Sequence, residues 1–159
     1  AKTLLPVMQE HYRLAYIRKP EFMGNTREEE RDPIYKKVKD LPWSEQTIRG
    51  RLKDYAALSS VVEEVEAKLP AHRKDAYMQL VKYPVQAADQ MNRKFLNAQL
   101  ARHGKVDWEQ SYAAFDSIAS LTRRYNALQN GKWIHMMDFQ PRKLPVFKRV
   151  AHELSLIHI

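Results

Sequence analysis

Apolar residues recur at helical spacing in four stretches of this chain. They cover about residues 2–18, 44–68, 71–102 and 107–130, and Pro20 ends the first of them. Only 4 glycines occur, which disfavours a turn-rich β fold and suits long helices. The links between the last three stretches are short. The pattern therefore predicts an all-α fold, an antiparallel bundle of about four long helices.

Each predicted helix carries an apolar stripe that we expect to face the core. The stripes are Leu4, Leu5, Met8, Tyr12 and Ala15; Ile48, Leu52, Tyr55, Leu58, Val62, Val65 and Leu69; Tyr77, Leu80, Val81, Val85, Ala88, Met91, Phe95 and Ala98; and Trp108, Tyr112, Phe115, Ile118, Ala119, Thr122 and Tyr125.

Several residues predict how the helices begin, bend and end. The hydroxyl of Ser44 is suited to an N-cap, and Asp107 with Gln110 resembles a capping box. Pro84 removes a helical hydrogen bond, so we expect a kink there. Gly104 is expected to close the third helix.

The character of the chain changes after residue 130. Pro141 and Pro145 are incompatible with a regular helix. We therefore predict a bundle domain over residues 1–130 and a connector over residues 131–152 that leads toward a following domain. The apolar residues of the connector are expected to begin an irregular or extended segment; they are Leu144, Val146, Phe147 and Val150.

The composition is that of a soluble globular protein, with 44% hydrophobic and 29% charged residues, no cysteine and no apolar run long enough to cross a membrane. The net charge of +8 raises a nucleic-acid-binding interpretation. However, the basic residues alternate with acids, as in residues 27–31 (REEER) and 63–68 (EEVEAK). Solvated helix faces are the favoured interpretation, and we expect no nucleic-acid partner.

His135 and Asp138 are the best candidates for chemistry, since a His and a carboxylate could transfer a proton or hold a metal. No third ligand is obvious. A histidine satisfied by a nearby carboxylate at a domain junction is the favoured alternative. We expect no metal and no cofactor.

Two other groups of residues have both a functional and a structural interpretation. The acids of residues 28–30 could supply a carboxylate pair, but a charged run is usually only solvated. Aromatic residues could stack on sugars, although at helical spacing they more often serve as core or anchor residues. These aromatics are Trp43, Trp108, Trp133, Tyr77, Tyr83, Tyr112 and Tyr125. No P-loop, GxSxG or HExxH pattern occurs, so we predict no catalytic residue in this chain.

Three segments together resemble one enzyme family. They are HYRLAYIRKPEFM (residues 11–23), LPAHRKDAYMQLVKYPVQAADQMNRKF (69–95) and NGKWIHMMDFQPRKLPVF (130–147). They are similar to the region that follows the catalytic barrel in glycoside hydrolase family 115, whose members are inverting xylan α-glucuronidases. The resemblance extends from residue 4 to about residue 150. It departs after Asp138, where many relatives have a Gln and an aromatic-rich stretch, which leaves the substrate open.

The resemblance implies a structural role for this chain. The family places a helical bundle between a barrel and a β-sandwich, so those domains of the same chain would be its partners, with polysaccharide bound by the parent enzyme. Acid, base and glucuronate-binding residues would lie in the barrel, and this piece alone would be inactive. Trp133, Met136 and Met137 would pack in the junction, together with the neighbouring His135 and Asp138. The parent would be a bacterial periplasmic or secreted enzyme, and its oligomeric state stays open.

Both ends of the sequence suggest a piece of a longer protein. The chain begins at Ala1, without Met and inside a predicted helix. The ending LSLIHI resembles translated sequencing-adapter read-through, so residues 153–159 are predicted to be non-native. The alternatives are a free-standing basic helical interaction domain that binds nucleic acid, and a piece that is itself catalytic through His135 and Asp138.

Overall fold

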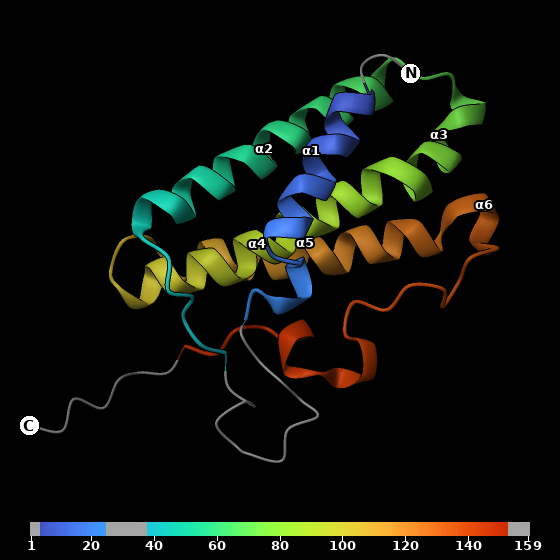
Figure 1. Cartoon of the computed structure of the whole chain (residues 1–159). Coiled ribbons are helices and arrows are strands. Elements are labelled where there is room, and N and C mark those ends of the chain that lie inside the picture. The colour runs from blue at the N-terminus through green and yellow to red at the C-terminus, as the bar shows by residue number, and fades with distance from the viewer. Residues whose placement is uncertain (1–3, 25–37, 153–159) are drawn as a thin grey trace, which may run out of the picture.

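The computed structural model describes residues 4–24 and 38–152, and within these ranges it contains helices and turns but no strand (Figure 1). This confirms the all-α prediction. The four long helices are α1 (Leu4–Ile17), α2 (Glu45–Ala67), α4 (Tyr83–Arg102) and α5 (Glu109–Asn126). The predictions for residues 25–37, including the acids at 28–30, and for residues 153–159 lie outside the described residues.

Shorter elements connect the long helices. They are α3 (Ala71–Tyr77), the π-helical turn Met78–Lys82, α6 (Leu128–Gly131), and 3-10 turns at Pro20–Phe22, Pro141–Lys143 and Pro145–Phe147. Figure 1 shows α2, α4 and α5 running alternately in opposite directions, with α1 crossing them. No helix in the described ranges has the length and apolar character that a membrane span requires.

Helix α4 is the centre of the bundle, because it packs against both α2 and α5. From Met91 to Ala101 every residue except Arg93 is buried. Two apolar clusters surround it. One gathers Ile48, Phe95 and Ile118 with other residues, and the second joins residues of α1 and α2, such as Leu14 and Tyr55, to the start of α4.

The predicted helix ends were right in two cases and wrong in one. The Ser44 hydroxyl accepts a hydrogen bond from the Thr47 amide at 3.1 Å, as an N-cap should. Gly104 has φ +66°, and the Lys105 amide donates to the Leu100 carbonyl, which completes a Schellman ending. The predicted capping box at Asp107 is absent, since α5 begins without a side-chain cap.

The third predicted helix is continuous but changes its winding before Pro84. In the π-helical turn the Tyr83 amide donates to the Met78 carbonyl, five residues back. This wider turn provides room for a proline ring that would clash in a regular helix. It also changes the helical phase, so Met78 is fully buried whereas Leu80 is 73% exposed. The prediction that Leu80 faces the core is therefore wrong.

Helix α1 buries a face that overlaps only partly with the predicted stripe, since Leu4 and Met8 pack against the core as predicted. Its core residues are Val7, His11 and Leu14, whereas Leu5 and Tyr12 of the predicted stripe are exposed. The expectation failed because α1 is apolar on more than one side, so spacing alone did not select the inward face.

The segment after Gly131 is irregular, which is the first of the two predicted alternatives, and it forms no extended run. Pro141 and Pro145 each begin a 3-10 turn, for which a proline at the first position is well suited. Val146 and Val150 are buried against the bundle. The boundary between residues 1–130 and 131–152 stays a prediction.

Candidate functional site

The predicted junction residues lie in the turns that follow α6. His135, Met136 and Asp138 are exposed, and Trp133 and Met137 are half-buried. Ile134, between them, is also exposed. The ammonium of Lys132 lies 5.3 Å from the centre of the Trp133 ring. This short stretch therefore presents a mixed apolar and polar surface.

His135 and Asp138 do not form a pair. In the described part of the chain no hydrogen bond or ion pair joins their side chains, and Asp138 instead accepts a hydrogen bond from the Gln140 amide at 2.8 Å. His135 has φ +64°, a left-handed turn conformation. Among the described residues no group of three His, Cys, Asp or Glu side chains could hold a metal ion. Within the described residues His135 and Asp138 therefore do not form a proton-transfer pair, and the histidine satisfied by a carboxylate at a domain junction stays a prediction.

The junction stretch is fixed to the bundle through its backbone. The Asn126 amide group donates to the Met137 carbonyl at 2.8 Å and accepts from the Met137 amide at 3.0 Å. The Gln99 side-chain amide makes the same pair of hydrogen bonds with Leu41: it donates to the Leu41 carbonyl at 2.9 Å and accepts from the Leu41 amide at 3.0 Å. In both cases a side-chain amide pairs with one residue of an irregular segment as a neighbouring strand would, which fixes the position of that segment.

Lys94 provides a second anchor for the segment after residue 140. Its ammonium donates to the carbonyls of Val146 at 2.6 Å and Lys148 at 3.1 Å, and it lies 4.3 Å from the centre of the Phe95 ring. The side chain is fully buried. Because burial penalises the charged form, the pKa of Lys94 is lowered to about 7.

A buried ion cluster joins α2, the π-helical turn and α5. Lys82 is buried and donates to Glu63 at 2.7 Å and to Glu66 at 2.6 Å, while Arg124 reaches the other oxygen of Glu66 at 2.5 Å. Burial opposes ionisation of Glu63, but hydrogen bonds from Lys82 and Gln86 outweigh it and lower the pKa of Glu63. The cluster thus satisfies its own charges.

Arg51 ties α1 to the rest of the bundle. Its buried guanidinium donates to Asn92 at 2.6 Å, to the Leu14 carbonyl at 3.1 Å and to the Arg18 carbonyl at 2.7 Å. Burial lowers the pKa of Arg51. A cation at these carbonyls also complements the negative end of the α1 dipole.

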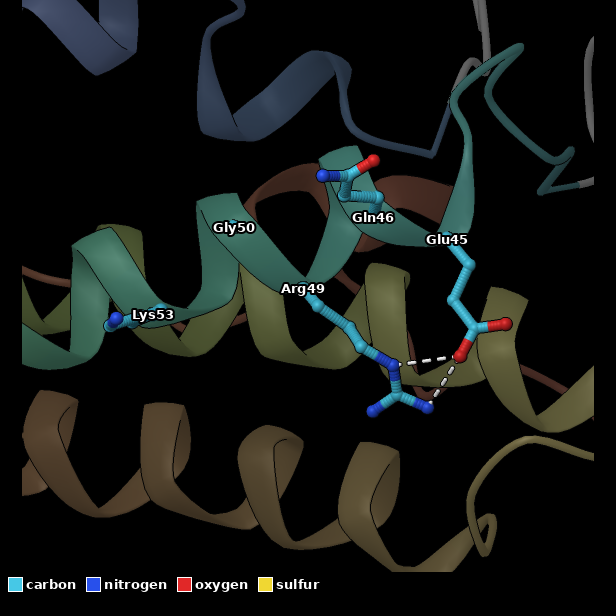
Figure 2. A pocket seen from close by; sticks show the side chains of 5 residues that line it. All are labelled: Glu45, Gln46, Arg49, Gly50 and Lys53. Atoms are coloured by element: carbon cyan, nitrogen blue, oxygen red, sulfur yellow. Dashed lines mark hydrogen bonds and ion pairs between the residues drawn. The ribbon is translucent and has the colours of Figure 1, made fainter.

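Many other basic residues pair with acids, which fits the expectation of mixed helix faces. The pairs are Arg13–Glu10, Arg49–Glu45, Arg93–Asp89, Arg102–Asp40 and Arg149–Asp116. Figure 2 shows the Arg49–Glu45 pair beside a shallow depression whose lining among the described residues comes from α2, at Glu45, Gln46, Arg49, Gly50 and Lys53. One helix face cannot surround a small substrate, so this depression is a weak candidate for chemistry.

The aromatic residues serve mainly as packing groups, as favoured from the sequence. Tyr77 and Tyr125 are buried, and Tyr83 meets Tyr125 edge to face. Trp43 and Trp108 pack against the cluster around Phe95. No row of exposed rings forms from the predicted set in the described residues.

Comparison with solved structures identifies one strong likeness. The chain is similar to BtGH115A, a family GH115 4-O-methyl-α-glucuronidase with specificity for decorated arabinogalactans, at 69% sequence identity and a TM-score of 0.92. The likeness covers 94% of this chain and 20% of that enzyme. No protein-family model and no curated protein matches the chain.

Sequence and structure therefore agree on the relationship that the three motifs indicated. Unrelated helical bundles can share a backbone arrangement by chance, but they do not share 69% of their residues over 94% of the chain. The chain belongs to glycoside hydrolase family 115, and it spans about a fifth of the length of the family member that it matches.

Proposed function

We propose that this chain is the helical supporting domain of an α-glucuronidase that removes glucuronic acid, or its 4-O-methyl ether, from a polysaccharide. The observation that carries the proposal is the 69% identity to BtGH115A over 94% of the chain. The chain spans about a fifth of that enzyme, so the catalytic machinery is assigned to other domains of the parent polypeptide.

A supporting role agrees with how the chain uses its polar groups. An inverting glycosidase needs two carboxyl groups placed on opposite sides of the scissile bond, with room for a water molecule. Here Glu66, Asp89, Asp40 and Asp116 each bind a basic side chain. The pairs of Glu66, Asp40 and Asp116 join different parts of the described chain, and that of Asp89 lies within α4, so these four carboxylates are occupied by structural contacts.

The proposal also concerns the polysaccharide that carries the glucuronic acid side chain. The family resemblance points to xylan, whereas BtGH115A is specific for decorated arabinogalactans. Both substrates share the glucuronic acid side chain. We therefore propose a parent enzyme that recognises this sugar, with the backbone polymer selected by domains outside this chain.

We further propose that residues 131–152 connect the bundle to a following domain, with Trp133, Met136 and Met137 at the junction. The exposed Ile134 and Met136 support this proposal, because apolar side chains in a turn gain stability when a neighbour covers them.

Segment replacement tests the supporting role. The matching segment of BtGH115A would be replaced by residues 4–150 of this chain, and release of 4-O-methylglucuronic acid would be measured on decorated arabinogalactan and on glucuronoxylan. We expect a chimera that folds and retains activity on arabinogalactan, while the isolated chain is inactive on both. A folded but inactive chimera, or an active isolated chain, would contradict the proposal.

A further inference from the structure

Helix α1 has an apolar face that no described part of the chain covers. Leu5, Tyr12 and Tyr16 are 62%, 65% and 93% exposed. They are spaced at i, i+7 and i+11, so at about 100° per residue they lie within about 40° of one another on the helix. We call these three residues the α1 outer face.

The α1 outer face lies opposite the face that α1 already buries. Val7 and Leu14, which are buried, are about half a turn away from it. The helix has one acid and one arginine in its 14 residues, Glu10 and Arg13, and these pair with each other at 2.5 Å. A helix that is apolar on opposite sides is normally enclosed on both, whereas α1 is enclosed on one.

We propose that the α1 outer face is a docking surface for another domain of the same polypeptide. This inference rests on the proposed function, because BtGH115A has about four fifths of its length outside the matched region. Interfaces between domains lose charged residues from their centres and gain tyrosine, and both features are present on the α1 outer face.

The size of the face favours a tethered domain over a second copy of the chain. Leu5 to Tyr16 spans about 16 Å along a helix about 10 Å wide, so the face offers roughly 200 Å². A stable association between separate molecules needs about 800 Å² from each partner. A domain in the same polypeptide meets the face at a high effective concentration, so a small contact is sufficient.

The shape of the surface favours protein over sugar. Leu5, Tyr12 and Tyr16 are exposed and line none of the three main pockets found in the described part of the chain. A pocket follows the flank of α1 instead, with Ala15, Met91 and Phe147 among its mainly apolar lining residues. An exposed apolar helix face beside an apolar groove is typical of a surface that packs against another protein domain. A sugar site would combine aromatic rings with several polar groups that point to one place.

Cysteine labelling tests the proposal directly, because the chain has no cysteine of its own. Tyr16→Cys would be labelled with a maleimide in the isolated chain and in the BtGH115A chimera, and the modified site would be followed by mass spectrometry. We expect fast labelling in the isolated chain, at least tenfold slower labelling in the chimera, and recovery of the fast rate in urea. Equal rates in the two folded proteins would overturn the proposal, as would protection that depends on the concentration of the isolated chain.

A charge placed on the face provides a second test. Tyr12→Asp with Tyr16→Asp should leave the melting temperature of the isolated chain nearly unchanged and lower that of the chimera. Leu80→Asp is the matched control, since Leu80 is 73% exposed on another element. If the control lowers the melting temperature of the chimera equally, the docking assignment fails. If the unsubstituted chimera fails to fold or has no activity, the proposed function fails first.

Discussion

Helices α4 and α1 are close in space but differ in how completely they are enclosed. On α4 several polar side chains are buried and partnered: Asn92 binds Arg51, Asp89 binds Ser59, and Lys94 binds two carbonyls. On α1 one side enters the core and the opposite side presents Tyr12 and Tyr16 to solvent. Within the described residues α4 is therefore enclosed on all sides, whereas α1 is enclosed on one side.

The largest loss of stability is expected when a cavity is made in the enclosed core around α4. Phe95→Ala removes a ring that is 2% exposed, so we expect a loss of about 3–5 kcal/mol in the free energy of unfolding. Phe22→Ala is the matched control, because Phe22 is exposed, and it should cost less than about 1 kcal/mol. Urea denaturation followed by circular dichroism measures both. Equal losses would mean that α4 is not the centre of stability.

The second prediction concerns the ion cluster. Glu66→Ala leaves the buried Lys82 with the more exposed Glu63 as its acidic partner. We expect a loss of roughly 2–4 kcal/mol, somewhat below the full cost of breaking a buried pair. Glu64→Ala, at an exposed position two residues away, should change little. The coupling of Glu66 with Lys82 is measured by adding Lys82→Met, and additive losses would show that the pair is not coupled.

The third prediction is a pH dependence that comes from Lys94. Its pKa is about 7 when folded and about 10.4 in an unfolded chain, so the folded state carries a penalty for the charge at low pH. Stability from this residue should rise as the pH increases from about 7 toward 10. Between pH 6 and pH 9 the gain is about 2–3 kcal/mol.

Lys94→Met isolates this contribution. Other groups also contribute to the pH dependence, among them His11, whose pKa is lowered by burial. The relevant measurement is therefore the difference in unfolding free energy between the parent chain and Lys94→Met at each pH. A difference that stays constant from pH 6 to pH 9 would show that Lys94 keeps an ordinary pKa.

The sequence predicted most of the fold because most helices signal their inward face and their ends clearly. The stripe from Ile48 to Val62 and the endings at Ser44 and Gly104 were right for local physical reasons. The errors have physical causes too. Leu80 turned outward because the π-helical turn changed the phase, and Tyr12 was assigned inward because both sides of α1 are apolar.

The anchors were harder to foresee than the helices. Lys94 and Asn126 look like ordinary surface residues of amphipathic helices, and their partners Val146 and Met137 are 52 and 11 residues away. Which carbonyl a side chain reaches depends on the path of an irregular segment, which spacing along the sequence does not determine.

The smallest loss of stability is expected for the exposed apolar residues after α6. Ile134→Ser combined with Met136→Ser should change the unfolding free energy of the isolated chain by less than about 0.5 kcal/mol, because both side chains are already in water. Val146→Ala, in the same segment but buried, should cost about 2 kcal/mol. If the double variant lowered the unfolding free energy as much as Val146→Ala does, the contrast between buried and exposed apolar residues in this segment would be wrong. In the BtGH115A chimera we expect the same double variant to lower the unfolding free energy by more than in the isolated chain, because another domain would cover Ile134 and Met136 there. Equal losses in the two proteins would show that no other domain covers these side chains.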